Sequence, residues 1–130
     1  MTYYKPSNVS MDEIRRVLSY IGVSRAYKGF ETTAVAVYML TRDPSKLDPI
    51  TVMLYPDVGA AMHVESHCVE RRIRTVIDAV WSRSPERFNR ITGFAFPDRP
   101  TATEFLEALA FFFLTASNYT AVMAEIDGKI

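Results

Sequence analysis

The sequence predicts an all-α fold, a compact bundle of about six helices that contains a helix-turn-helix. Apolar residues recur at helical spacing in several segments, two capping boxes mark helix starts, and no segment shows a confident strand pattern. The chain has 130 residues, of which 48% are hydrophobic and 23% are charged. These values predict one globular domain over residues 1–130, with residues 1–9 and 118–130 as its least patterned parts.

Two helices are predicted in the first third of the chain. The first begins at a capping box formed by Ser10 and Glu13 and ends at Gly22. Its apolar residues follow at helical spacing: Ile14, Val17, Leu18 and Ile21. The second helix covers residues 29–42 and ends before Pro44, and its length favours a helix over a strand.

Two short helices are expected next. Asp48 is interpreted as the N-cap of the first, with Pro49 at the first helical position. Pro56 interrupts this helix because proline has no backbone N–H to donate, and it starts another short helix that ends at Met62. Residues 63–65 then form a tight connection to the following helix.

The helix predicted over residues 66–81 has the clearest pattern in the chain. Ser66 is expected to cap it, and Trp81 lies beside its apolar face. That face contains five aliphatic residues at one-face spacing: Val69, Ile73, Val76, Ile77 and Val80. The opposite face carries His67, Arg71, Arg74 and Asp78, flanked by Glu70 and Arg72.

The last part of the chain predicts a loop and a buried helix. Residues 86–100 are expected to be mostly loop, with a short turn of helix near Phe88, because glycine and proline recur there. Thr101 and Glu104 form a second capping box, and the buried positions after it are Phe105, Leu109, Phe112 and Phe113. We expect Phe111 or a neighbour to stay exposed and to pack against a second copy of the chain.

The polar face of the 66–81 helix suggests recognition of duplex DNA. Arginine makes bidentate contacts with guanine in the major groove and also binds phosphate. The preceding short helix and three-residue turn complete a helix-turn-helix. Net charge is zero, but residues 71–90 hold six arginines against two acids. The alternative is a surface helix with solvated arginines, since most surface helices have a charged outer face.

Other kinds of site are not supported. His63 and His67 are four residues apart and Cys68 is adjacent, but the expected turn separates the two histidines, so we predict no metal site. No catalytic constellation or glycine-rich phosphate loop occurs, and we expect neither a cofactor nor an enzyme. The N-terminus lacks the apolar core of a signal peptide, and no apolar run, that at residues 109–114 included, approaches the roughly 20 residues that span a bilayer. A cytoplasmic protein without membrane contact is therefore expected.

Three segments resemble the C-terminal effector domain of the stage-zero sporulation protein A family, the response regulators that initiate sporulation. They are LYPDV at 54–58, VERRIR at 69–74 and AVWSR at 79–83. Shorter matches extend the resemblance over about residues 10–115: residues 21–23, 28–30, 93–94, 100–101 and 104–105. The resemblance implies six helices, a helix-turn-helix, sequence-specific transcriptional control, and pairing of two domains on adjacent DNA boxes.

The resemblance also implies which residues contact DNA. By position these are Glu70, Arg71 and Arg74, of which Glu70 is suited to accept a hydrogen bond from cytosine N4. Ser66, His67 and Thr75 from the same helix complete the expected DNA-binding set. RNA polymerase is a further partner to consider.

Three departures from the family pattern leave a second interpretation open. Only about nine residues precede the first helix, so we expect no receiver domain. The chain is then expected to be either a stand-alone domain or an excised one. His67 and Cys68 stand where the family has Ser-Arg, and the turn at residues 63–65 includes an acid, Glu65. The alternative is an interaction module that pairs with a full-length regulator or with RNA polymerase and binds DNA weakly or not at all.

Overall fold

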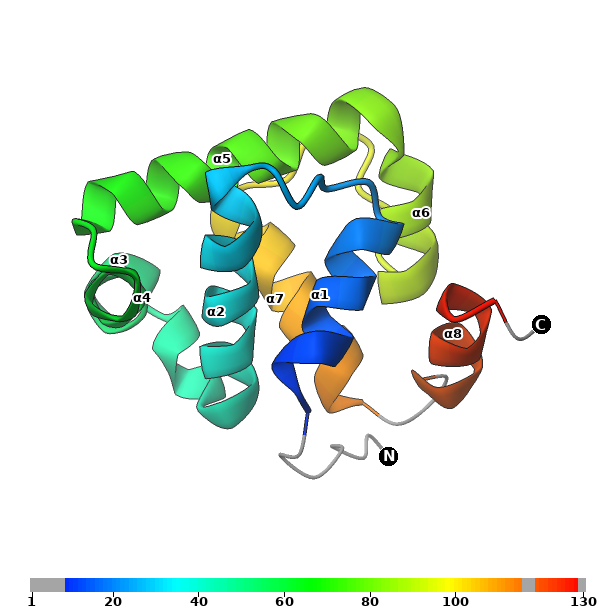
Figure 1. Cartoon of the computed structure of the whole chain (residues 1–130), viewed down its shortest axis with the longest axis horizontal. Helices are drawn as coiled ribbons and strands as arrows, with labels where there is room; N and C mark the ends of the chain where they lie inside the picture. The colour runs from blue at the N-terminus through cyan, green and yellow to red at the C-terminus, as the bar shows by residue number, and fades with distance from the viewer. Residues whose placement is uncertain (1–8, 116–118, 129–130) are drawn as a thin grey trace.

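In the computed structural model, residues 9–115 and 119–128 are described, and they contain eight α-helices, one 3₁₀ helix and no β-strand (Figure 1). The all-α prediction is confirmed. The helices are α1 (Met11–Tyr20), α2 (Lys28–Arg42), a 3₁₀ helix (Pro44–Leu47), α3 (Ile50–Met53), α4 (Tyr55–Met62), α5 (Ser66–Arg83), α6 (Pro85–Thr92), α7 (Ala102–Leu114) and α8 (Tyr119–Ile126). In this part of the chain no helix is long and apolar enough to cross a bilayer.

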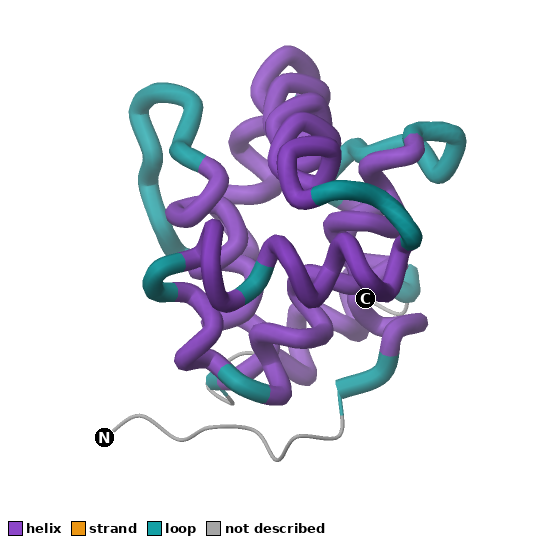
Figure 2. Tube along the Cα trace, turned by 90° about the vertical axis from the view of Figure 1, so that its left-hand side faces the viewer, coloured by secondary structure: helices purple, strands orange, loops and turns teal. Residues whose placement is uncertain are grey.

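Helix α5 lies across one side of the bundle, over the ends of α2 and α7 (Figure 1). Seen end-on, it forms a ridge with loop segments on both sides (Figure 2). Its apolar face is buried as the spacing predicted: Val69, Ile73, Val76, Ile77 and Val80 are each at most 2% exposed. Burial of five aliphatic side chains, at about 1.5–3 kcal/mol each, fixes which face of α5 remains in solvent.

Both predicted capping boxes are confirmed. In α1 the backbone N–H of Glu13 donates to Ser10 Oγ at 3.2 Å, and the Ser10 N–H donates to Glu13 Oε1 at 3.0 Å. In α7 the corresponding bonds between Thr101 and Glu104 are 3.1 and 2.9 Å long. These bonds satisfy N–H groups that have no partner inside the helix, so both helices start where the sequence predicted.

Two of the other predicted caps are wrong. Helix α3 begins at Ile50, its N-cap is Pro49 rather than Asp48, and no side chain caps it. Ser66 is the first residue of α5 rather than its cap; Glu65 occupies the N-cap without a side-chain bond. A carboxylate does cap the 3₁₀ helix, where Asp43 accepts from the Ser45 N–H at 3.2 Å.

The prediction of a mostly irregular segment at 86–100 is wrong for its first part, which forms the two turns of α6. Pro85 lies in the first turn, where its missing N–H costs nothing, and Gly93 ends the helix at φ 79°. Phe88 and Ile91 are buried on one face of α6. Helix α8, in a part without a clear sequence pattern, adds Met123 to the core, whereas residues 1–8, 118 and 129–130 of the two ends lie outside the described residues.

Aromatic contacts fasten the end of α5 to the segment that follows α6. The Trp81 ring packs edge-on against Phe88 and Phe96, with centroid distances of 5.3 and 6.4 Å. Phe96 in turn stacks on Phe94, whose ring meets Phe111 of α7. Phe111 is 41% exposed, so the expectation of an exposed phenylalanine in this run is confirmed.

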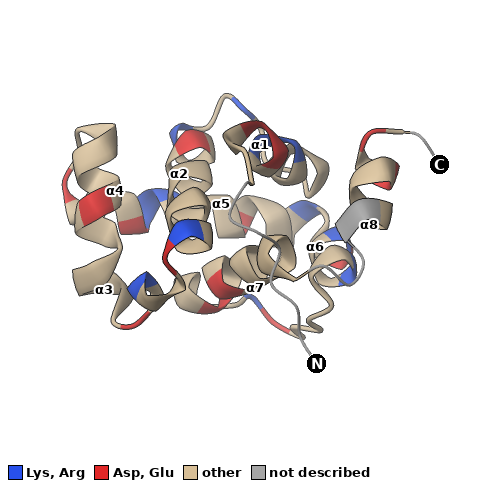
Figure 3. Cartoon of the chain, turned by 90° about the horizontal axis from the view of Figure 1, so that it is seen from below, with Lys and Arg blue, Asp and Glu red and all other residues tan. Residues whose placement is uncertain are grey.

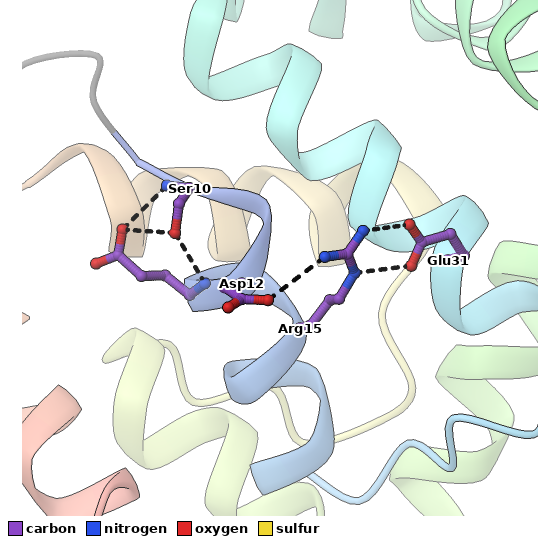
Figure 4. A network of polar contacts seen from close by, with 5 residues as sticks. Ser10, Asp12, Arg15 and Glu31 are labelled. Carbon is purple, nitrogen blue, oxygen red and sulfur yellow. Dashed lines mark hydrogen bonds and ion pairs between the residues drawn. The ribbon is translucent and has the colours of Figure 1, made fainter.

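A bidentate ion pair joins α1 to α2. Arg15 donates from Nε and Nη2 to the two carboxylate oxygens of Glu31 at 3.0 and 2.7 Å, and a third bond reaches Asp12 (Figure 4). The hydrogen bond from Arg15 lowers the pKa of the Glu31 carboxyl below its usual value. Because the pair lies near the surface, we assign it a small part of the stability.

Two glycines let neighbouring helices approach the backbone of α5 and of the turn before it. A Cβ at Gly29, on α2, would lie 2.5 Å from the carbonyl oxygen of Arg72. A Cβ at Gly59, on α4, would lie 2.5 Å from the carbonyl oxygen of Val64. Real Cβ atoms do not come this close to a carbonyl oxygen, so any larger residue has to displace the backbone of one partner.

The ion pair between Arg15 and Glu31 is expected to make stability depend on pH. We expect Glu31→Gln to lower the free energy of unfolding by about 0.5–1 kcal/mol near pH 7. A lowered folded-state pKa gives stability that is present above the unfolded glutamate pKa, about 4.3, and is lost as the pH falls through the folded value. Urea unfolding at several pH values measures this: the difference between parent and variant shrinks in acid. The exposed Glu107→Gln is the control, and equal stabilities of parent and Glu31→Gln at pH 7 would contradict the prediction.

The close approach at Gly59 is expected to reverse the usual effect of alanine in a helix. Alanine at a helical position normally stabilises by up to about 1 kcal/mol relative to glycine. We expect Gly59→Ala to do the opposite and to destabilise by about 1–3 kcal/mol, because its methyl group displaces the Val64 carbonyl. Urea unfolding of this variant and of Ala60→Ser, an exposed control on the same helix, makes the comparison. A Gly59→Ala variant as stable as the parent would show that the close approach is not a constraint.

Candidate nucleic-acid interface

Helices α4 and α5 and the turn between them form a helix-turn-helix. His63 ends α4 in the left-handed conformation, at φ 60° and ψ 42°, which short polar residues and histidine tolerate better than most. The N–H of Val64 then donates to the carbonyl of Gly59 at 2.9 Å. The predicted three-residue connection is confirmed, and its tightness depends on the absence of a side chain at Gly59.

The outer face of α5 presents the residues that the sequence singled out. His67, Arg71, Arg74 and Thr75 are exposed, and the side chains of His67 and Arg74 are 68% and 69% exposed. Ser66 and Glu70 are half-buried at the edge of this face. The structure therefore places four of the six predicted residues on the exposed face of a single helix and the other two at its edge, with the five aliphatic residues on the buried side.

The charged groups on this face are held by neighbours one turn away. Arg74 Nη2 donates to Glu70 Oε2 at 2.6 Å, and Arg71 Nη2 lies 3.6 Å from the Cys68 sulfur. Thr75 Oγ1 donates to the carbonyl of Arg71 at 3.1 Å. Exposed i,i+4 pairs contribute only about 0.3–0.5 kcal/mol, so a ligand that binds these arginines has little to displace.

Arg72 has a different role from its neighbours. Its Nη1 donates to Thr32 Oγ1 of α2 at 3.2 Å, and Thr32 is fully buried. The guanidinium thus points towards α2 and away from the outer face of α5. Although they are adjacent in the sequence, Arg71 lies on the exposed face and Arg72 joins α5 to α2.

Tyr55 lies beneath the polar edge of α5. The residue is 2% exposed, and burial, with a smaller contribution from the nearby Glu70 carboxylate, raises the pKa of its phenol to about 12. It is therefore neutral at physiological pH. This tyrosine belongs to the LYPDV segment. Because it is buried, it helps to join α4 to the start of α5 and is not exposed to a ligand.

Acidic groups near the interface moderate its positive charge. Glu65, in the turn, is 81% exposed and lies 3.9 Å from the imidazole of His67. Asp78, one turn beyond Arg74, pairs with Arg99 at 2.7 Å. On the side seen from below, acidic and basic residues are also interspersed (Figure 3). In the described residues, no group of three or more metal-ligating side chains comes together.

A short helix, a tight turn and a long helix with a polar outer face define the class of helix-turn-helix DNA-binding domains. The family model described as "Sporulation initiation factor Spo0A C terminal" matches residues 14–111, and the chain belongs to this family. It is a family of DNA-binding effector domains of response regulators in sporulation, not of enzymes. The chain thus has a DNA-binding regulatory role, and α8 lies beyond the matched residues.

Proposed function

We propose that this chain recognises a specific duplex-DNA sequence by placing α5 in the major groove, and that it regulates transcription by doing so. The observation that supports this most strongly is the division of α5 into a buried aliphatic face and an exposed face with Arg71 and Arg74. A helix of 18 residues is about 27 Å long and, with side chains, about 10–12 Å wide, which the major groove admits.

Each residue of the outer face receives a role on chemical grounds. Arg71, which has only a weak sulfur contact, is free to make a bidentate contact with guanine. Arg74 and Glu70 exchange their mutual ion pair for a guanine or phosphate and for a cytosine amino group. Ser66, His67 and Thr75 contact the backbone or base edges on either side, and α4 crosses the backbone.

We also propose that two copies bind side by side on tandem sites. The exposed phenylalanines Phe94 and Phe111 adjoin each other, with ring centroids 6.2 Å apart, and offer an apolar surface for a second copy. RNA polymerase is a further candidate for contact with this regulator once it is bound to DNA.

A second candidate function is supported by the acids at the interface. Glu65 stands exposed in the turn, and the Glu70 carboxylate neutralises Arg74. A domain with this charge pattern and zero net charge would also suit an interaction module that pairs with a full-length regulator or with RNA polymerase. Such a module would bind all duplexes weakly and alike.

One experiment separates these functions. Duplexes recovered by the protein from a random library are titrated by fluorescence anisotropy against a scrambled duplex, as single and as tandem sites, at two salt concentrations. We expect selective binding that weakens with salt and is cooperative on tandem sites. Arg71→Ala is expected to weaken binding to the selected site by about 1–3 kcal/mol, with Arg42→Ala, on the far end of α2, as control.

The outcomes are distinct. Equal weak binding to selected and scrambled duplexes would reject sequence-specific recognition and favour the interaction module. Selective binding that Arg71→Ala leaves unchanged would keep the DNA-reading function and remove Arg71 from it. Independent binding at the two halves of a tandem site would reject pairing of the copies on DNA.

A further inference from the structure

Two loops run along the sides of α5, each with an arginine. The loop at residues 21–27 passes in front of the helix and the segment at 93–101 behind it (Figure 1). A Cβ at Gly22 would lie 4.0 Å from Oγ of Ser84, the residue that follows α5, so the start of the first loop lies close to the end of this helix. The segment behind carries Arg99, which reaches the outer face of α5.

Arg99 contacts that face directly. Its Nη1 lies 2.7 Å from Asp78 Oδ1, and the two side chains are 61% and 55% exposed. Asp78 follows Arg74 by one helical turn. A shallow groove between α5 and the segment is lined by Arg74, Asp78, Arg99 and Thr101, so two guanidiniums border one hollow that opens to solvent.

The segment is held in place from its other side. Phe96 packs on Trp81 and Phe88, and Thr101 is already committed to capping α7. Pro97 and Pro100 restrict the backbone on either side of Arg99. Arg99 is thus presented from an anchored segment, and its attachment does not depend on the ion pair with Asp78.

We infer that Arg99 is a DNA-backbone contact, which exchanges Asp78 for a phosphate at one edge of the major groove. This inference rests on the proposed function of α5. A helix of about 10–12 Å fills a groove of about 12 Å, so the segment beside it meets the phosphates that border the groove rather than the bases. Guanidinium is suited to bidentate contact with phosphate. Arg74 lines the same shallow groove on the protein surface as Arg99.

Asp78 then has a defined part. In the free protein it neutralises Arg99, and near DNA its carboxylate opposes the phosphates. The pair therefore reduces the general affinity of this face for polyanions, whereas a docked α5 brings a phosphate close enough to compete for the guanidinium. Substitution of Arg99 and substitution of Asp78, each made alone, are therefore expected to have opposite effects on DNA binding.

The test uses the full chain and the selected duplex described above. Arg99→Gln, Asp78→Asn and the control Arg42→Gln are titrated by fluorescence anisotropy from 50 to 200 mM salt, after thermal melts show that each is folded. Each phosphate contact changes the slope of log affinity against log salt by about 0.9. Relative to its value at 1 M salt, the contribution of one contact to the affinity is therefore about eightfold at 0.1 M salt. Arg99→Gln is expected to weaken binding by about this factor and to flatten the slope. Asp78→Asn is expected to tighten binding and to steepen the slope. Arg42→Gln is expected to change neither the affinity nor the slope.

Three results would overturn the inference. Arg99→Gln with the affinity and slope of the parent would exclude the contact. Equal weakening by Arg99→Gln and Asp78→Asn would show that the ion pair only fastens the segment to α5. A loss with Arg42→Gln as large as that with Arg99→Gln would reduce the effect to net charge. In each case the parent still binds its site selectively, whereas loss of selective binding by the parent would reject the proposed function itself.

Discussion

The architecture depends on how closely α2 and α4 approach the backbone around α5. At Gly29 and Gly59 a single methyl group would lie 2.5 Å from a carbonyl oxygen of Arg72 or Val64. Because these two positions have no side chain, α2 and α4 pack closely against α5 and its preceding turn, and five aliphatic residues of α5 are buried beneath it. Because that face cannot turn outward without a large loss of buried apolar surface, the opposite face is fixed in solvent. The positions of the candidate DNA contacts on α5 follow from this arrangement.

The basic side chains on and beside the exposed face of α5 are accessible, but most of them lie next to an acidic side chain. Glu70 holds Arg74, Asp78 holds Arg99, and Glu65 lies near His67. Exposed pairs of this kind are weak, so a phosphate or a guanine edge displaces an acid at small cost. A chain with zero net charge can therefore have a local anion-binding face without a strong general attraction to polyanions. In such a protein, discrimination depends on the fit of α5 in the groove more than on total charge.

Much of this could be predicted from the sequence, because the responsible signals are local. Helical spacing identified the buried face of α5, and reciprocal Ser/Glu and Thr/Glu pairs located the starts of α1 and α7. The errors also have local causes: Asp48 and Ser66 are residues that commonly cap helices, but the proline and the tight turn beside them set the helix starts instead. Helix α6 is short and flanked by Pro85 and Gly93, so its pattern resembles that of a loop. The inward direction of Arg72 and the pairing of Arg99 with Asp78 join segments far apart in the chain, and no periodicity reveals such contacts.

In the function proposed here, the exposed face of α5 reads bases from the major groove. Methylation interference on a selected duplex tests it most directly, because guanine N7 lies in the major groove and adenine N3 in the minor groove. Recognition by α5 predicts that methylation of guanine N7 at positions within the site prevents binding, whereas methylation of adenine N3 within the site does not. Binding that tolerates every N7 methyl group, or that only N3 methylation blocks, would contradict it.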